Sequence, residues 1–316
     1  MNEFNLIKQY FTRRTHHTNL SVGDDAALIS VSAGMQLAIS SDMLVAGTHF
    51  FHDATPHDIG WKALAANVSD MAAMGANPKW ATLAIALPEV KDAWLSEFSR
   101  GFFACADAFN IDLIGGDTTR GPLNISVTIM GEVPSGQAIK RSGAQVGDDI
   151  WVSGQLGSAA LGLAHLQGIT HVPEAILPAC LNTLHTTTPR AALGLALRGI
   201  ATSCIDVSDG LLADLGHILT ASNCGAMIDL EKIPCIEWIK SDLGNPQFQA
   251  TILAGGDDYE LCFTAPKSKR DEINALCKQL NVPINHIGST RMAVGLQTYY
   301  KNKKLTLLKH GFKHFD

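Results

Sequence analysis

Short apolar runs alternate along the chain with segments of helical periodicity. The pattern predicts helices at residues 3–13, within 55–78, and at 93–110, 211–221 and 269–280, and strands at residues 35–44, 80–87, 111–117, 124–133, 201–205 and 283–287. Such alternation of strands and helices is typical of the α/β class. A turn-rich segment at residues 141–149 interrupts the pattern. We therefore expect two domains, residues 1–137 and residues 138–316.

The helix expected within residues 55–78 carries one badly placed charge. Thr55 suits the N-cap and Pro56 the first helical position. Asp70 falls on a face that is otherwise made of small or apolar residues. A solvated Asp near a helix end is the simpler interpretation. A buried carboxylate, however, is costly unless it is paired or bound to a metal, and the same pattern recurs elsewhere in the chain.

Acidic residues end predicted strands or begin predicted helices at six places. They are Asp25, Asp42, Asp70, Asp117, Asp206 with Asp209, and Asp257 with Asp258. Ser40 and Ser41 precede Asp42, and we expect an oxygen-rich corner at that strand end, which suits a hard cation. Two carboxylates about 4 Å apart repel by about 4 kcal/mol at an effective dielectric near 20. Converging acids would therefore need divalent cations, and all-oxygen ligands favour magnesium and polyphosphate chemistry.

Composition narrows the class of protein. Hydrophobic residues make up 46% of the sequence and charged residues only 17%, which indicates a compact globular protein. The net charge is −6 and no block of Lys or Arg occurs, so we expect neither nucleic acid nor a membrane as partner. The N-terminus lacks a signal pattern, and none of the seven cysteines forms a C-x-x-C pair. We expect reduced thiols and a cytoplasmic location.

Seven stretches resemble the motifs of the thiamine-monophosphate kinase family, within the superfamily of aminoimidazole ribonucleotide synthetase. The stretches are residues 23–26, 40–50, 67–75, 115–120, 141–144, 205–211 and 255–261. Each is weak alone, but seven in order over nearly the whole chain are highly specific. The resemblance implies an N-terminal α/β domain that binds ATP and magnesium, with a C-terminal α/β domain beside it. It also implies that the N-terminal sheet forms a β-barrel with that of a second subunit.

The resemblance further implies transfer of the γ-phosphoryl group of ATP onto thiamine monophosphate, giving thiamine diphosphate. The acceptor is a phosphate monoester with a second pKa of about 6, so it is largely a dianion at pH 7. No general base is then required, and we expect direct in-line transfer. A homodimer also agrees with the strands at 37–40, 80–87 and 124–133, which are apolar on nearly both faces.

The family motifs assign roles to individual residues. The residues that look like magnesium ligands are Asp25, Ser40, Ser41, Asp42, Asp70, Asp117, Asp206 and Asp209. The residues that look like ATP contacts are Gly116, Asp117, Arg141 and Ser208, and those that look like substrate contacts are His49, Asp257 and Phe312. Among all of these, we expect Asp42, Asp117, Arg141 and Asp209 to be catalytic. Position 257 departs from the family, which more often has Glu there.

Two other functions stay open at this point. A purine-pathway ligase of the same superfamily would use ATP to activate an amide oxygen. A non-catalytic nucleotide- or metal-binding protein would bind ATP without turnover.

Overall fold

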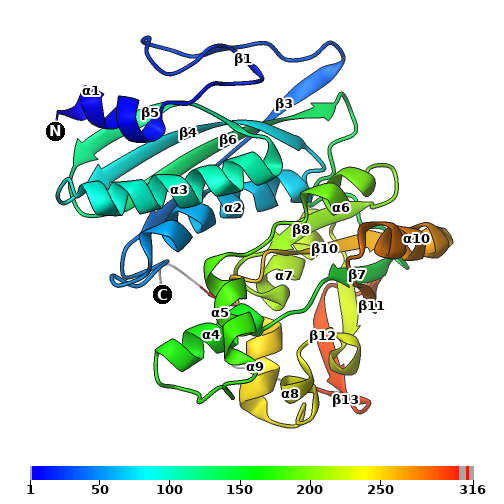
Figure 1. Ribbon diagram of the computed structural model, residues 1–316. Helices are drawn as coiled ribbons and strands as arrows, with labels where there is room; N and C mark the ends of the chain where they lie inside the picture. Colours follow the sequence, from blue (N-terminus) through cyan, green and yellow to red (C-terminus); the bar gives the residue numbers. More distant parts are fainter. Residues whose placement is uncertain (1, 306–310, 313–316) are drawn as a thin grey trace. The chain divides into compact units, whose positions relative to one another are not determined.

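The chain folds into two compact units, each with its own β-sheet. A computed structural model describes residues 2–305 and 311–312 (Figure 1). The first unit contains residues 1–71 and 76–136, and the second contains residues 72–75 and 137–316. Each unit combines a sheet with helices on its faces, which confirms the two-domain α/β class.

The first unit is built on a four-stranded sheet with the order β3-β6-β4-β5. Its elements are α1 (Glu3–Leu6), a π-helix (Ile7–Phe11), β1 (Thr18–Leu20), β2 (Leu28–Ile29), β3 (Met35–Val45), α2 (Pro56–Ala73), β4 (Asn77–Leu87), α3 (Asp92–Phe109), β5 (Asp112–Arg120) and β6 (Asn124–Pro134). β6 pairs antiparallel with both β3 and β4, and β5 pairs parallel with β4. α2 and α3 lie together on one face of this sheet (Figure 1).

The other face of this sheet leaves apolar side chains open to solvent. Along β3, Ile39 is 62% exposed and Met43 is 55% exposed. Side chains of a strand alternate between its faces, so both lie on the face opposite to Ser40 and Asp42. An exposed apolar sheet face of this kind is typical of a surface that another layer covers.

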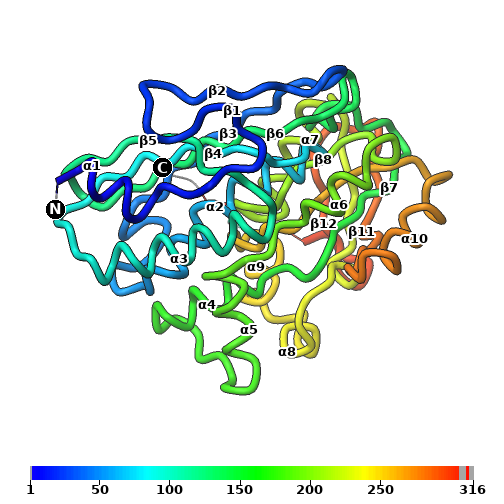
Figure 2. The backbone as a smooth tube through the Cα atoms, turned by 45° about the horizontal axis from the view of Figure 1, so that its top comes forward, coloured from blue at the N-terminus to red at the C-terminus, as the bar shows by residue number. Residues whose placement is uncertain are grey.

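The N-terminal segment runs along the edge of the first unit at β5 (Figure 2). Its helical part ends at Phe11 and closes with a π-helical turn, so the predicted extension to Arg13 is wrong. β1 and β2 then pair as a small antiparallel sheet. Residues between these elements fold back over β5 and carry the first acidic motif.

The second unit is built on a seven-stranded sheet with the order β13-β12-β9-β11-β7-β10-β8. Its elements are β7 (Asp149–Ser153), α4 (Ser158–Leu166), α5 (Leu177–His185), α6 (Ala191–Ala196), β8 (Ser203–Val207), α7 (Leu211–Ala221), β9 (Gly225–Asp229), a 3-10 turn (Leu230–Lys232), α8 (Glu237–Lys240), α9 (Pro246–Ala254), β10 (Glu260–Ala265), a 3-10 turn (Lys267–Lys269), α10 (Arg270–Leu280), β11 (Ile284–Arg291), β12 (Gly295–Tyr300) and β13 (Lys303–Lys304).

Alternating side chains of the seven-stranded sheet enter two separate cores. On one face, residues such as Val152 and Val207 pack with α7 and α9. On the other face, Trp151 and Phe263 stack at 6.4 Å and pack with α6 and α10. The sheet is therefore buried on both faces through β7, β8 and β10, which fixes the loops that leave these strands.

Three acidic motifs lie elsewhere on their elements than the sequence predicted. Ser40, Ser41 and Asp42 lie in the middle of β3 and not at its end, because the ladder with β6 continues to Val45. Gly116 and Asp117 lie within β5, and Asp206 lies within β8. Polar residues do not end a strand whose backbone groups are paired by a neighbour.

The motif at residues 255–258 follows a helix and not the strand that the sequence suggested. α9 ends at Ala254, and β10 begins only at Glu260. The apolar residues before Gly255 belong to the helical face that packs into the core beside α7. A short apolar run does not distinguish a buried helix from a strand.

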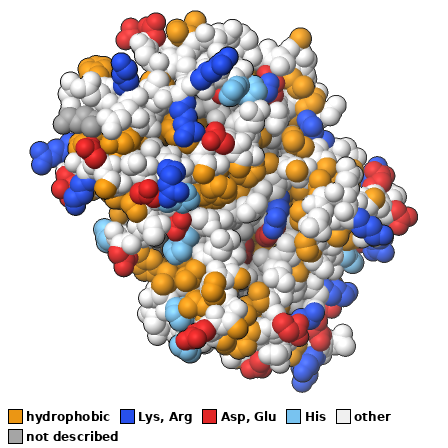
Figure 3. Space-filling model, viewed as in Figure 1, with side chains coloured by type: hydrophobic (Ala, Val, Ile, Leu, Met, Phe, Trp, Pro, Cys, Tyr) orange, Lys and Arg blue, Asp and Glu red, His pale blue; other side chains and the backbone are white. Residues whose placement is uncertain are grey.

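No helix within residues 2–305 and 311–312 has both the length and the apolar character needed to cross a membrane. All seven cysteines are free, and all but Cys277 are buried. On the face shown in Figure 3, Lys and Arg side chains are interspersed with Asp and Glu.

Candidate functional site

An acid pair and a hydroxyl meet where β3 crosses α2. The Ser40 hydroxyl donates a hydrogen bond of 2.5 Å to Oδ2 of Asp70. Asp42 lies two residues further along β3, on the same face as Ser40, and its carboxyl group feels the charge of Asp70. The helix within 55–78 forms as predicted, from Pro56 to Ala73, and turns Asp70 toward the strand. The structure thus brings three predicted metal ligands together.

Both burial and charge act on Asp42. Loss of hydration raises the pKa of its carboxyl group to about 6, and the negative charge of Asp70 contributes in the same direction. The folded chain therefore holds these two carboxylates together against their mutual repulsion. A cation between them would remove that cost.

Ser41 and His49 flank this pair on the same segment of chain. The Ser41 hydroxyl lies 2.9 Å from the Thr128 hydroxyl of β6, on the sheet face opposite to Asp42, so it does not join the acid pair. His49 follows β3 in a tight loop, where its Nδ1 accepts a 3.0 Å hydrogen bond from the backbone N–H of Val45. In the neutral ring the proton then resides on Nε2, which makes Nε2 a donor.

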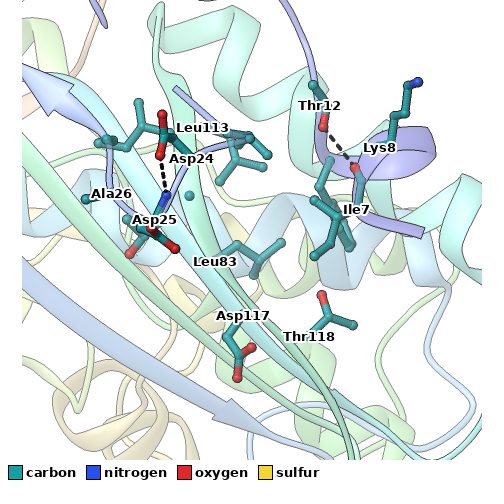
Figure 4. Close-up of a pocket in the computed structure, with 18 of the residues that line it drawn as sticks. Ile7, Lys8, Thr12, Asp24, Asp25, Ala26, Leu83, Leu113, Asp117 and Thr118 are labelled. Atoms are coloured by element: carbon teal, nitrogen blue, oxygen red, sulfur yellow. Dashed lines mark hydrogen bonds between the residues drawn. The ribbon is translucent and has the colours of Figure 1, made fainter. Parts of the chain in front are cut away.

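A second group of predicted residues lines a cavity of about 800 Å³ in the first unit. Asp25, Gly116 and Asp117 belong to its wall, and Asp24 and Asp25 lie across it from Ile7 and Thr12 (Figure 4). At Gly116, with a φ of 146°, a Cβ atom would lie 1.8 Å from the carbonyl oxygen of Leu83. Only glycine allows β5 to approach β4 this closely. The register between the two strands shifts two residues earlier, at Ile114.

In the second unit, the loop after β8 is fixed by a buried acid. The backbone N–H groups of Ser208, Asp209 and Gly210 donate hydrogen bonds of 3.0, 3.1 and 3.0 Å to Oδ2 of Asp214. Asp214 lies in the first turn of α7, and burial, together with the nearby charge of Asp209, raises its pKa to about 7. The loop conformation is thus set by three convergent donors.

The motif at residues 255–259 packs directly onto this loop. The Asp257 N–H donates to the Ser208 carbonyl at 2.9 Å. A Cβ atom on Gly256 would lie 2.3 Å from the same carbonyl oxygen. Asp257 adopts a left-handed conformation with a φ of 67°, and the next residue, Asp258, caps α4 by accepting from the Gly157 N–H at 2.6 Å.

Of the other predicted residues in the second unit, one joins this loop and one does not. Phe312 donates its N–H to the Asp209 carbonyl at 3.0 Å, so Ser208, Asp209, Asp257 and Phe312 are close neighbours. Arg141 is exposed, and its carbonyl accepts a hydrogen bond from Ser222 at the C-terminal end of α7. Because α7 has 11 residues and Ser208 precedes its first turn, this unit does not bring Arg141 to Ser208.

Sequence reasoning missed the acids that hold these motifs in place. Asp214 and Asp258 are 3% exposed, and both accept hydrogen bonds from backbone N–H groups. Burial raises the pKa of Asp258 to about 8. Asp214 falls in the first turn of a predicted helix, where acids are favourable. That position is the one sequence feature that could have indicated its structural role. The sequence predicts Asp258 only as part of the acidic motif that it forms with Asp257.

Among residues 2–305 and 311–312, no three or more His, Cys, Asp or Glu side chains form a group able to hold a metal ion alone. The acid pair therefore offers a partial set of ligands. Magnesium commonly takes one or two carboxylates and completes its six ligands with water and substrate phosphates. The oxygen donors of Ser40, Asp42 and Asp70 fit that requirement.

Two family models match the chain in succession. The model "AIR synthase related protein, N-terminal domain" matches residues 23–133, and the model "AIR synthase related protein, C-terminal domain" matches residues 145–299. The chain is 45% identical to thiamine-monophosphate kinase of Salmonella typhimurium over 318 aligned residues, which cover 99% of this chain and 98% of that protein. It is 34% identical to thiamine-monophosphate kinase of Bacillus subtilis, with both chains fully covered.

Solved structures agree with these sequence relatives. The crystal structure of thiamine-monophosphate kinase from Stenotrophomonas maltophilia matches with a TM-score of 0.85 and 45% identity, covering 96% of each chain. AaThiL, solved in complex with AMPPCP and TMP, matches with a TM-score of 0.78 and 28% identity, covering 99% of this chain and 96% of that one.

The raised pKa of Asp42 predicts a gain of stability when its charge is removed. A carboxyl group with a raised pKa binds its proton more tightly in the folded state, so the folded state loses stability as the pH rises from about 4 to about 6. In metal-free protein at pH 7.5, we expect Asp42→Asn to raise the free energy of unfolding by about 1–3 kcal/mol. The gain should vanish below pH 4. Urea titration in excess chelator measures this difference.

The exposed loop acid Asp53 offers a matched control for that experiment. Asp53→Asn should change the free energy of unfolding by less than about 0.5 kcal/mol at either pH. If Asp42→Asn is no more stable than the wild-type protein at pH 7.5, the negative charge of Asp42 does not destabilise the folded state.

Proposed function

The chain belongs to the AIR synthase related family and, within it, to the thiamine-monophosphate kinases, and from this premise we propose how its residues divide the work. The activity is phosphorylation of thiamine monophosphate by ATP, giving thiamine diphosphate. We assign ATP and magnesium binding, together with dimerisation, to residues 1–137. Residues 138–316 form the C-terminal α/β domain.

The observation that carries the magnesium assignment is the meeting of Asp42 and Asp70 beside the Ser40 hydroxyl. Two carboxylates held together at a cost of stability provide a site that a divalent cation completes. When bound, magnesium supplies neutralisation of the negative charge on the phosphates. We assign Asp25 and Asp117 to the same task, because both line the cavity that contains Gly116.

In the second unit, the remaining assignments rest on two loops: the loop after β8, which contains Ser208, and the loop at residues 255–259, which contains Gly256. Asp206 and Asp209 are assigned as further metal ligands, and Ser208 as an ATP contact. Asp257 is assigned to the thiamine half of the acceptor, since thiamine offers a cationic thiazolium ring and an aminopyrimidine donor. Phe312, which is 50% exposed and bonded to the Asp209 backbone, supplies an aromatic surface beside it.

The chemistry needs positioning more than proton transfer. The acceptor phosphate is already largely a dianion at pH 7, because its second pKa is about 6. The task of the protein is to bring two anions together in line. We assign His49, whose Nδ1 accepts from the Val45 N–H, to the acceptor substrate. Arg141 contributes positive charge, as the family motif implies.

Two alternative functions have less support. A purine-pathway ligase would share the family models but not 45% identity with thiamine-monophosphate kinases over nearly the whole chain. The same identity to relatives named as kinases also weighs against a non-catalytic binding protein. The buried free thiols also support a reducing, cytoplasmic setting.

A direct assay tests this assignment. Thiamine monophosphate, ATP and magnesium incubated with the protein should give thiamine diphosphate and ADP, separable by ion-exchange chromatography. We expect Asp117→Asn to lower kcat at least 100-fold, because it removes a carboxylate assigned to hold the magnesium that neutralises the phosphates. Asp53→Asn should leave kcat unchanged. Turnover that persists in excess chelator or in Asp117→Asn would refute the magnesium assignment.

Replacement of Asp257 separates the two substrates. Asp257→Asn removes the charge but keeps a side chain that tolerates the left-handed conformation. The KM for thiamine monophosphate should rise on the order of 10- to 100-fold, as expected for loss of a charged hydrogen bond, while the KM for ATP should stay within two-fold. Asp257→Glu should be mild. Steady-state kinetics with each substrate varied in turn decides this, and a selective rise in the KM for ATP would assign the motif to the nucleotide.

The open face of the four-stranded sheet supports a homodimer. Ile39 and Met43 lie exposed on its edge strand β3, and a second copy of the sheet would cover them. We expect a dimer by light scattering at micromolar concentration and a monomer for Ile39→Lys. Met292→Lys, at an 81% exposed apolar residue in the second unit, is the matched control and should stay dimeric. A monomeric wild-type protein would contradict this proposal.

A further inference from the structure

The cavity that holds Asp25 and Asp117 has two chemically different walls. Asp24 and Asp25 lie across the cavity from Ile7, Lys8 and Thr12 of the N-terminal segment (Figure 4). Phe4 and Phe11 of the same segment also line the cavity. Phe4 is 80% exposed at this cavity. A ligand with an apolar planar end and a polyanionic end, such as a nucleoside triphosphate, matches both walls.

Both walls depend on one stretch of chain. Phe4, Ile7, Lys8, Phe11 and Thr12 line the cavity, as do residues 22–27, and residues 13–21 connect the two groups. The placement of this connection therefore sets the position of Phe4 and Ile7 and also of Asp25. A shift of the connection would move the apolar wall and a predicted metal ligand together.

Asp112 fastens this connection to the sheet. It is the first residue of β5 and is only 4% exposed. Its carboxylate accepts hydrogen bonds from the His16 N–H at 2.9 Å, from the His17 N–H at 2.6 Å and from the Thr18 hydroxyl at 2.8 Å. A carboxylate can accept all of these at once, since it has about four acceptor positions and no donor.

Weaker contacts support the same attachment from outside. Arg13 pairs with Asp107 at 3.2 Å and lies 3.8 Å above the ring of Phe103, both on α3. Trp80 of β4 donates its indole N–H to the His17 carbonyl at 3.0 Å. The connection is thus also held at Arg13, before the residues that Asp112 binds, and at His17 among them.

We propose that Asp112 is a positioning residue for nucleotide binding, which acts by fixing the N-terminal wall of this cavity. The proposal rests on the assignment of the cavity to ATP. Asp112 is not among the described residues that line the cavity, so its effect is on the affinity for ATP and not on the chemical step. Binding of thiamine monophosphate should not depend on it.

Glu132 provides a matched control in the same unit. It is also 4% exposed, and its carboxylate accepts from the Ser32 N–H at 2.7 Å, the Ser32 hydroxyl at 3.0 Å and the Lys79 ammonium group at 2.6 Å. It therefore fastens a loop to the sheet as Asp112 does. Ser32, however, is not among the described residues that line the cavity.

The test compares Asp112→Asn with Glu132→Gln in the full-length protein. Asn presents an N–H₂ group to backbone donors and so loosens the connection. We expect Asp112→Asn to raise the KM for ATP at least ten-fold, with kcat and the KM for thiamine monophosphate within two-fold of wild type. Glu132→Gln should leave all three constants within two-fold. Equal rises of the KM for ATP in both variants would overturn the proposal, since general loosening would then explain them.

Arg13→Ala keeps the test decisive if Asp112→Asn does not fold. Arg13 is half-exposed, and loss of such a surface pair costs about 1 kcal/mol or less. We expect a two- to five-fold rise in the KM for ATP alone. A KM for ATP equal to wild type in every folded variant refutes the role of Asp112, whereas a wild-type protein that makes no thiamine diphosphate refutes the proposed function instead.

Discussion

The repulsion between carboxylates is the constraint around which the first unit is arranged. Asp42 and Asp70 come from different elements and stay together only because β3 is locked into the sheet and α2 is packed beneath it. The Ser40 hydroxyl bonds to Asp70, but it cannot neutralise either charge. Burial and, to a smaller extent, the charge of Asp70 raise the pKa of Asp42 to about 6. A bound cation would offset the repulsion between the two carboxylates. At this acid pair, the folded protein therefore loses stability and gains affinity for a cation.

In the second unit, buried acids hold two loops in place without a bound ligand. Asp214 gathers three successive N–H groups, and Asp258 caps a helix from inside a loop. These buried acids satisfy backbone donors that would otherwise be costly. The residues assigned to substrates are then free to face outward from a rigid backbone.

The sequence was sufficient for element types and for most residues of the candidate site. Helix signals placed α2 and α7 closely, because caps and periodicity are local. Predictions from the sequence failed where contacts with distant segments determine the structure. β3 continues through Asp42 because it pairs with β6, and the apolar run before Gly255 is a helix because it packs beside α7. Asp112 and Glu132 gave no signal at all, since their partners lie some 100 residues away.

The contact between Gly256 and the Ser208 carbonyl has a consequence for how this family can vary. A side chain at position 256 would strike the neighbouring loop at 2.3 Å. A side chain at position 256 therefore requires the loop at Ser208 to move, so the two segments constrain each other although 48 residues separate them in the sequence. Anyone who transplants a new acceptor specificity onto this scaffold has to exchange both loops at once.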